Sequence, residues 1–148
     1  MKGPSLRQIG WVVTFLYLLA VAFMVFWPVH IDSGQVGGVV QETVDTGHSQ
    51  GWLPLWYGYS HVEWTSNLLM FLPGGFLFTL LLQPARPWLV PLGGLMATAS
   101  IETIQLLMPG RTSSPLDILA NALGCVIGWV LALGLLKIVG KHKEKAEI

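Results

Sequence analysis

Charged side chains are scarce in this chain of 148 residues, of which Asp, Glu, Lys and Arg make up only 11%. A soluble domain carries about 25% of them, and a domain of about 150 residues still exposes about 30% of its unfolded surface to water. Apolar residues make up 53% of the chain, a larger share than a soluble domain of this size could bury away from water. The composition therefore excludes a soluble enzyme and a disordered chain, and the net charge of zero argues against a nucleic-acid binder.

Cysteine is also scarce: Cys125 is the only one, so an intramolecular disulfide is excluded. The chain has long apolar runs instead, and a helix that crosses a bilayer needs about 20 mostly apolar residues. Four runs qualify, so we expect an all-α membrane protein, a four-transmembrane-helix bundle that forms a single domain over residues 1–148. The predicted spans are 9–29, 64–83, 88–108 and 116–139.

Lysine and arginine predict the orientation, because these residues are enriched on the cytoplasmic side of membrane proteins. With both termini in the cytoplasm, only Arg111 lies outside, and the others lie inside: Lys2, Arg7, Arg86, Lys137, Lys141, Lys143 and Lys145. We therefore expect a multi-pass protein of the cytoplasmic membrane, with an outer loop at 30–62 and a basic cytoplasmic tail at 140–148. The first apolar run is too long for a signal peptide and no small-residue cleavage site follows it, so we expect a retained helix.

The outer loop between the first two spans has two parts. The part from Asp32 to Gln50 is polar and rich in glycine, so we expect irregular structure there. The part from 51 to 59 is densely aromatic, which is typical of segments in the membrane–water interface. It either lies in that interface or forms the lip of a binding site for a lipid or another amphiphile. The residues of such a lip are Trp52, Trp56, Tyr57 and Tyr59.

Polar side chains of the last three spans are predicted to reach one level, the outer third of the membrane. Glu63 and Asn67 lie one helical turn apart, as do Asp117 and Asn121, and Arg111 lies in the short loop before the fourth span. Intramembrane ionisable groups usually have a function. The structural alternative is that Asp117 and Glu63 simply stabilise the starts of their helices.

Glu102 and Gln105 complete this polar cluster, and Glu102 is its most informative member. It lies six residues, or about 9 Å, below the outer end of its span. A carboxylate at that depth costs a few kcal/mol unless it is paired, protonated or hydrated. Thr98, Glu102 and Gln105 share one helical face, which we expect to point into the bundle, with Arg111 as the partner of Glu102.

Small residues mark two of the spans. Pro73-Gly74-Gly75 falls in the middle of the second span, where proline removes a backbone donor and predicts a kink or an unwound turn. In the fourth span small residues recur at every fourth position and favour close helix contacts, with Gly124 and Gly128 as a candidate contact between copies in a homo-oligomer. The repeat consists of Ala120, Gly124, Gly128 and Ala132.

Two ordered motifs resemble those of the VanZ-like membrane proteins, over about residues 9 to 139. The first runs from Glu63 to Phe76 and reads acid, Asn67, then Phe-x-Pro-x-Gly-Phe, with Gly74 where the family often has Leu. The second runs from Ser100-Ile-Glu102-Thr-Ile-Gln105 through Arg111, Asp117, Asn121, Gly124 and Gly128, with Ser113-Ser114-Pro115 where the family is more polar. The resemblance implies a small polytopic inner-membrane protein and a link to resistance against teicoplanin, a glycopeptide with a fatty tail.

Three functions fit these patterns. The first is a binding protein with an outward-facing polar pocket for a membrane lipid, a lipid-linked envelope molecule or a glycopeptide antibiotic, in which Arg111 meets an anionic group. The second is a membrane enzyme that acts on a lipid-linked substrate through the carboxylates of Glu102, Asp117 and Glu63. These oxygens could also hold a divalent cation, although we expect no cofactor. The third is a structural or assembly subunit whose polar cluster is a packing network.

Overall fold

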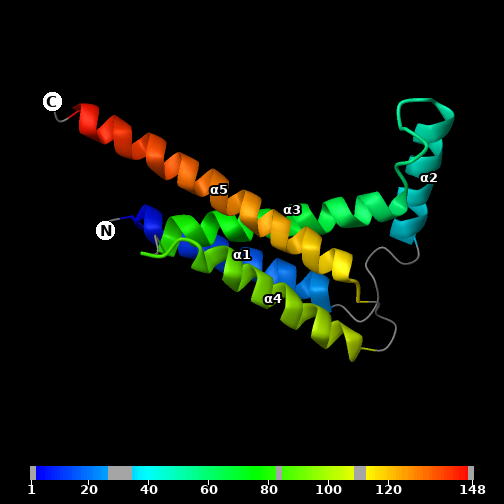
Figure 1. The fold of residues 1–148 in the computed structure, drawn as a ribbon, viewed down its shortest axis with the longest axis horizontal. Coiled ribbons are helices and arrows are strands. Elements are labelled where there is room, and N and C mark those ends of the chain that lie inside the picture. Colours follow the sequence, from blue (N-terminus) through cyan, green and yellow to red (C-terminus); the bar gives the residue numbers. More distant parts are fainter. Residues whose placement is uncertain (1–2, 27–34, 83–84, 109–112, 147–148) are drawn as a thin grey trace.

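The computed structural model describes residues 3–26, 35–82, 85–108 and 113–146, and most of these residues are helical with no strand among them. They form five helices (Figure 1). The helices are α1 (Leu6–Phe26), α2 (Gln35–Ser49), α3 (Tyr59–Leu82), α4 (Leu89–Leu106) and α5 (Pro115–Ala146).

Four of these helices are long and apolar enough to cross a membrane: α1, α3, α4 and the Pro115–Gly140 part of α5. The predicted number of spans is therefore confirmed. The largest difference in their bounds is at α3, which begins at Tyr59 and so starts five residues before the predicted position 64. Large apolar side chains such as Phe15 and Phe23 are exposed on α1, as is typical of a surface that contacts lipid rather than water.

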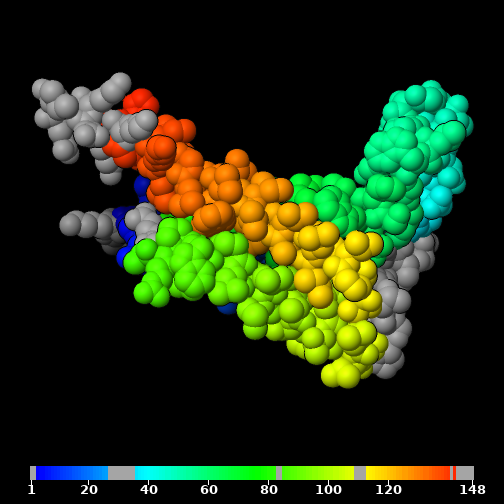
Figure 2. All heavy atoms as spheres, in the orientation of Figure 1, coloured from blue at the N-terminus to red at the C-terminus, as the bar shows by residue number. Residues whose placement is uncertain are grey.

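The spanning helices alternate in direction, so the beginning of α1 and the end of α5 lie at the same end of the bundle (Figure 1). The cytoplasmic location of this end stays a prediction from the lysine and arginine residues. α5 continues well beyond the predicted span and reaches Ala146, so most of the predicted tail at 140–148 is helical. At the other end of the bundle, α2 and the segment after it project beyond the spanning helices (Figures 1 and 2), and α2 contacts α3.

The prediction of irregular structure between Asp32 and Gln50 is wrong for residues 35–49, which form α2. Its glycines and polar residues disfavour a helix when only the local sequence is considered. However, apolar side chains recur at every fourth position, at Val36, Val40 and Val44, and share one face. Val44 is buried, and the other two line a pocket between the helices. Tertiary contact of this face therefore stabilises a helix that its composition alone does not favour.

The most extensive contact in the bundle is between α3 and α5, and glycine makes it possible. A Cβ atom at Gly124 would collide with the backbone carbonyl of Leu68, and one at Gly128 with the carbonyl of Leu72. From the other side, a Cβ atom at Gly75 would collide with the carbonyl of Cys125. The two helices therefore approach to backbone contact, as small residues permit in membranes. Gly124 and Gly128 are buried in this contact within one chain, and association of copies stays a prediction.

Helix α3 continues through Pro73 without a break, so of the two predicted alternatives the unwound turn is absent. Neighbouring helices commonly stabilise a proline inside a membrane helix by satisfying the freed backbone groups. Here Gly74 and Gly75 directly after the proline are contact points for α1 and α5. The three residues therefore act as a packing surface on a continuous helix.

Candidate functional site

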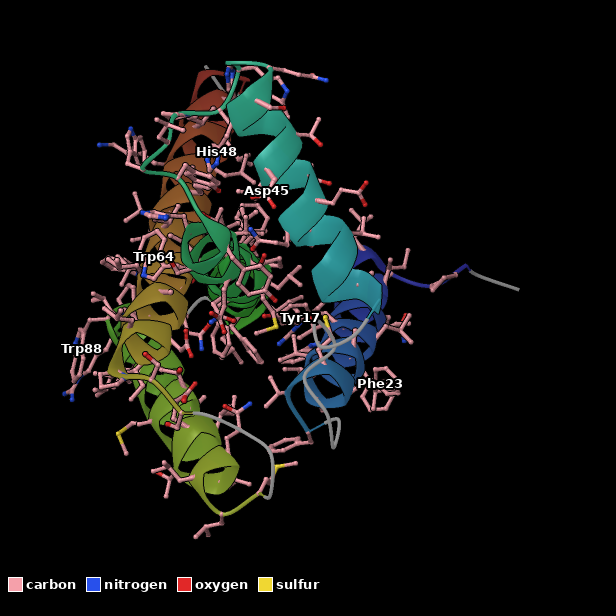
Figure 3. The ribbon with its side chains drawn as sticks, turned by 90° about the vertical axis from the view of Figure 1, so that its right-hand side faces the viewer. Tyr17, Phe23, Asp45, His48, Trp64 and Trp88 are labelled. Atoms are coloured by element: carbon pink, nitrogen blue, oxygen red, sulfur yellow. The ribbon has the colours of Figure 1, made fainter. Side chains whose placement is uncertain are left out.

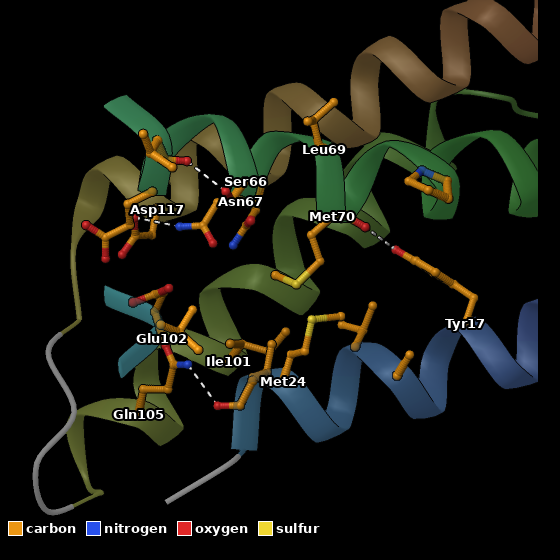
Figure 4. A pocket seen from close by; sticks show the side chains of 18 of the residues that line it. Tyr17, Met24, Ser66, Asn67, Leu69, Met70, Ile101, Glu102, Gln105 and Asp117 are labelled. Atoms are coloured by element: carbon orange, nitrogen blue, oxygen red, sulfur yellow. Dashed lines mark hydrogen bonds between the residues drawn. The ribbon is translucent and has the colours of Figure 1, made fainter. Parts of the chain in front are cut away.

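A partly open pocket of about 600 Å³ lies among the helices (Figure 4). All of the described helices contribute to its wall, and α3 contributes the longest stretch, from Tyr59 to Pro73. These two residues are 73 − 59 = 14 positions apart, so at a rise of 1.5 Å per residue the pocket extends about 21 Å along α3. Sites for small molecules typically have volumes of about 300–1,000 Å³. The pocket is therefore large enough to hold a ligand.

The pocket brings together the predicted polar residues that the structure describes. Arg111 lies outside the described residues, and nothing is said of its position. The others come from α3, α4 and α5, and they all line the pocket: Glu63, Asn67, Glu102, Gln105, Asp117 and Asn121. Their contribution to function stays a prediction, but segments that are far apart in the sequence meet here as expected from their depth.

Asn67 and Asp117 connect α3 to the first turn of α5. The Asn67 side-chain amide donates a hydrogen bond of 2.8 Å to the Asp117 carboxylate (Figure 4). The cap of α5 is formed by another residue, since Ser114 Oγ accepts a hydrogen bond from the backbone N–H of Leu116 at 3.1 Å. Asp117 is therefore positioned against the pocket rather than used as the N-cap of its helix.

Glu102 is 4% exposed and connects α4 to the beginning of α5. Its Oε2 accepts a hydrogen bond of 3.2 Å from the backbone N–H of Ser114, the residue that caps α5. In a capping box a Glu of the same helix satisfies this N–H, whereas here a Glu of a neighbouring helix does so. This contact explains in part how a carboxylate is accommodated inside a span, and its predicted partner Arg111 is outside the described residues.

The face of α4 that was expected to point into the bundle does so: Thr98, Glu102 and Gln105 are all buried. Gln105 Nε2 donates to the backbone carbonyl of Val25 on α1 at 3.0 Å. Asn121 Nδ2 donates to Thr98 Oγ1 at 2.9 Å. The other polar atom of this amide, Asn121 Oδ1, is buried and has no hydrogen-bond partner in the described part of the chain.

Tyr17 lies at the deep end of the pocket and was not identified from the sequence. Its hydroxyl group donates a hydrogen bond of 2.8 Å to the backbone carbonyl of Met70 (Figure 4). A Cβ atom at Gly74 would lie 2.8 Å from the same hydroxyl oxygen, so Gly74 leaves the space that Tyr17 occupies. Seen along the bundle, Tyr17 points inward from α1, whereas Phe23 points away (Figure 3). In the sequence of α1 after Gln8, Thr14 is the one other polar side chain, and its burial one turn before Tyr17 marks the same inward face.

Apolar side chains form most of the remaining wall. Val21 and Met24 come from α1, Leu69 and Met70 from α3, and Ile101 from α4. Methionine has a flexible, polarisable side chain that adapts to ligands of different shapes. These residues were also missed at the sequence level, because each is an ordinary apolar residue in an apolar span. The pocket thus has carboxylates and amides in one part of its wall and apolar side chains in the rest.

The aromatic segment after α2 lies mostly outside the pocket. Trp52 and Trp56 are 59% and 71% exposed and do not line it. Tyr57 stacks on His61, with ring centroids 5.2 Å apart. Of the four aromatic residues proposed as a lip, Tyr59 alone lines the pocket. The alternative of a segment in the membrane–water interface therefore fits the two exposed tryptophans better than a lip does.

Among the described residues, no group of three or more His, Cys, Asp or Glu side chains is placed to hold a metal ion. Glu63, Glu102 and Asp117 line one pocket, but they do not form such a group. The described side chains therefore do not support a site for a divalent cation, which the sequence allowed as an option.

Comparison with known proteins identifies the family. The VanZ/LLP1 family model matches residues 14–137, which include α3, α4, most of α1 and of the spanning part of α5, and every described polar residue of the pocket. No curated protein and no solved structure matches the chain. The match agrees with the two motifs that resemble the VanZ-like proteins and with the multi-pass helical architecture. This chain therefore belongs to the VanZ/LLP1 family of integral membrane proteins.

Proposed function

We propose that this protein binds an amphiphilic molecule of the cell envelope in the pocket between its helices. One observation carries the proposal: a pocket of about 600 Å³ in a membrane protein combines carboxylate and amide side chains with an apolar wall. A head group would contact the side chains of Asn67, Asp117 and Glu102, and an apolar tail would lie along Met24 and Met70. The orientation predicted from lysine and arginine places the pocket on the outer side of the membrane.

The dimensions of the pocket support a ligand that is larger than an ion. The wall extends about 21 Å along α3 from Tyr59 to Pro73, more than half the thickness of the hydrocarbon core of about 30 Å. A ligand bound along this length would keep its tail at a depth where hydrocarbon is the natural surrounding. An envelope lipid and a lipoglycopeptide with a fatty tail, such as teicoplanin, both have this form, and protection against teicoplanin is the resistance function that we propose.

Binding has more support than catalysis. A catalytic pair would need one carboxylate with a raised pKa and a second as base, or an ion held between them. The Glu102 carboxylate instead accepts a backbone N–H at the start of α5, and Asp117 accepts the amide of Asn67. Both contacts favour a fixed polar surface over groups that exchange protons with a substrate.

Filling the apolar part of the pocket tests the proposal. Met24→Trp places an indole ring in the pocket wall, whereas Leu19→Trp adds the same ring to the exposed face of α1. We expect the native protein and Leu19→Trp, purified from membranes at equal yield, to retain a bound envelope amphiphile that native mass spectrometry detects. Met24→Trp should lose it. Equal retention in both variants, or no bound amphiphile in the native protein, would contradict the proposal.

The resistance function needs a separate measurement in a susceptible host. With native protein and both variants at equal levels in the membrane, we expect protection against teicoplanin but not against vancomycin, which has no fatty tail. Met24→Trp should abolish this protection, and Leu19→Trp should not. If the protein binds an envelope lipid but protects against neither drug, resistance is not its function, and amphiphile binding still stands.

A further inference from the structure

The polar part of the pocket is rich in hydrogen-bond acceptors and negative charge. Carboxyl groups of Glu63, Glu102 and Asp117 reach it from α3, α4 and α5, and none of the described residues that line it is Lys, Arg or His. Arg111 is the only Lys or Arg between Arg86 and Lys137 in the sequence. The pocket therefore has three carboxyl groups against no more than one arginine from the outer half of the bundle.

The side-chain amides of the pocket already use their nitrogen atoms within the protein. Asn67 donates to Asp117 at 2.8 Å and Gln105 donates to the Val25 carbonyl at 3.0 Å. Asn121 donates to Thr98 Oγ1 at 2.9 Å. Each amide thus uses one of its two N–H groups within the bundle, and each has a carbonyl oxygen as its other polar atom. A ligand that is itself an acceptor is left with the second N–H group of each amide.

Asn121 gives an independent indication of a missing donor. Its side chain is 2% exposed and lines the pocket, and its Oδ1 has no hydrogen-bond partner in the described part of the chain. A buried acceptor without a donor is unfavourable, and almost all such atoms in proteins have a partner. A ligand with an N–H or O–H group at this position would provide it.

We infer that the head group bound in this pocket is a protonated amine, so that the ligand is a cationic amphiphile or a lipid with an ammonium group. The inference deepens the proposed function and depends on it. An ammonium group has three N–H donors and no acceptor, so it suits a pocket wall that presents carboxylate and amide oxygens. It carries the charge opposite to that of the three carboxylates of Glu63, Glu102 and Asp117, whereas a phosphate or carboxylate head group repeats their charge.

An amine also fits better than a metal ion. Mg²⁺ needs near-ideal octahedral geometry and Ca²⁺ needs six to eight oxygen ligands, and no group of three or more acidic, His or Cys side chains in the described ranges is placed for this. An ammonium group accepts less regular positions, because each N–H donates to one oxygen separately. The separate positions of Glu102, Asp117 and Asn121 Oδ1 in one wall are therefore compatible with it.

Three probes with the same tail separate the head group from the tail. Dodecylamine has charge and N–H donors, dodecyltrimethylammonium has the charge without the donors, and dodecanoate has the opposite charge. Their dissociation constants are measured with the purified full chain in a non-ionic detergent by the shift of thermal unfolding, which rises with occupancy. We expect dodecylamine to bind at least about tenfold more tightly than dodecanoate, with dodecyltrimethylammonium between them.

Isosteric variants assign this preference to the pocket. Glu102→Gln removes one charge and keeps an oxygen for the Ser114 N–H, and Glu42→Gln removes the same charge from the exposed surface of α2 as a matched control. We expect Glu102→Gln to raise the dissociation constant of dodecylamine by about tenfold and to leave that of dodecanoate unchanged, and Glu42→Gln to change neither. Asp117→Asn provides the same test if Glu102→Gln does not fold.

The outcomes separate this inference from the proposed function. If dodecanoate binds as tightly as dodecylamine, or if Glu102→Gln weakens both equally, the head group is not an amine, although the pocket binds amphiphiles. If none of the three probes binds at millimolar concentration, the proposed function itself is wrong. A preference for dodecylamine that is lost in Glu102→Gln and kept in Glu42→Gln supports both.

Discussion

Replacing one glycine of the α3–α5 contact by alanine should destabilise the protein strongly. A Cβ atom at Gly124 would overlap the backbone carbonyl oxygen of Leu68, and this oxygen belongs to a helix that cannot move alone. Added methylene groups in a tightly packed core cost about 1–3 kcal/mol. Because the obstacle is backbone rather than a flexible side chain, we expect about 3 kcal/mol for Gly124→Ala. For a chain of this size, 1 kcal/mol lowers Tm by about 2–4 °C, so Tm should fall by about 6–12 °C.

Gly134→Ala on the same helix is the matched control. A Cβ atom there has no other atom within 4 Å, so alanine meets open space. Alanine is favoured over glycine in a helix by about 1 kcal/mol in water. We therefore expect Gly134→Ala to have a Tm equal to or slightly above that of the native protein. The difference between the two variants isolates the helix contact from the intrinsic preference for helix.

The double variant Gly124→Ala/Gly128→Ala adds a test of mechanism. Both glycines contact α3 one turn apart, so separation of the helices by the first Cβ atom makes room for the second. The combined loss should then be smaller than the sum of the single losses, as for coupled neighbouring sites. Thermal unfolding in detergent, followed by circular dichroism, measures all of these values. A Tm of Gly124→Ala within about 2 °C of that of Gly134→Ala would refute the backbone contact.

Three further predictions follow, two with the same unfolding assay and one with chemical labelling. Tyr17→Phe removes the hydrogen bond to the backbone of α3 and should cost about 1 kcal/mol, and a Tm equal to that of the native protein would contradict this contact. Thr98→Val leaves the Asn121 amide without its acceptor and should cost about 1–3 kcal/mol, whereas Thr103→Val on the exposed side of α4 should cost less than about 0.5 kcal/mol. The thiol of Cys125 is buried against α4, next to Val90 and Gly94, and should react with a maleimide only when the protein unfolds, so rapid labelling of the folded protein would argue against the described α4–α5 packing.

The spans and the buried face of α4 could be predicted because both are properties of the local sequence. A run of apolar residues has to reach a certain length to cross a bilayer, and that length is counted directly. The spacing of Thr98, Glu102 and Gln105 places them on one face of any helix, and polar residues in a span turn to its interior. Neither the spans nor this buried face requires knowledge of which helix packs against which.

Helix α2 could not be predicted because its stability comes from contacts outside its own sequence. Its glycines and polar residues favour irregular structure. The valines at every fourth position form a narrow apolar face that becomes decisive only when α3 and the pocket are present beside it. Val36 and Val40 line the pocket because other helices lie beside them, and the composition of residues 30–62 does not contain this information.

Tyr17 illustrates the same limit at the site itself. It is one of several aromatic residues in an apolar span. Its position at the deep end of the pocket depends on Gly74 of α3, which has no side chain to occupy that space. The sequence marks Pro73-Gly74-Gly75 clearly, but a proline followed by two glycines predicts a weakened helix as readily as a helix with close neighbours. The contacts of Gly74 with Tyr17 and of Gly75 with Cys125 show that this helix has close neighbours and is not weakened.

These three positions also connect the stability of the bundle with the shape of the pocket. Pro73 lines the pocket, Gly74 admits the Tyr17 hydroxyl, and Gly75 admits the backbone at Cys125. A side chain at Gly75 would meet backbone and force α3 and α5 apart, whereas one at Gly74 would meet the end of a side chain that can rotate. The first change therefore acts on folding and the second on the depth of the pocket. In this motif the pocket wall and a helix contact therefore share one turn of α3, so one stretch of sequence determines both.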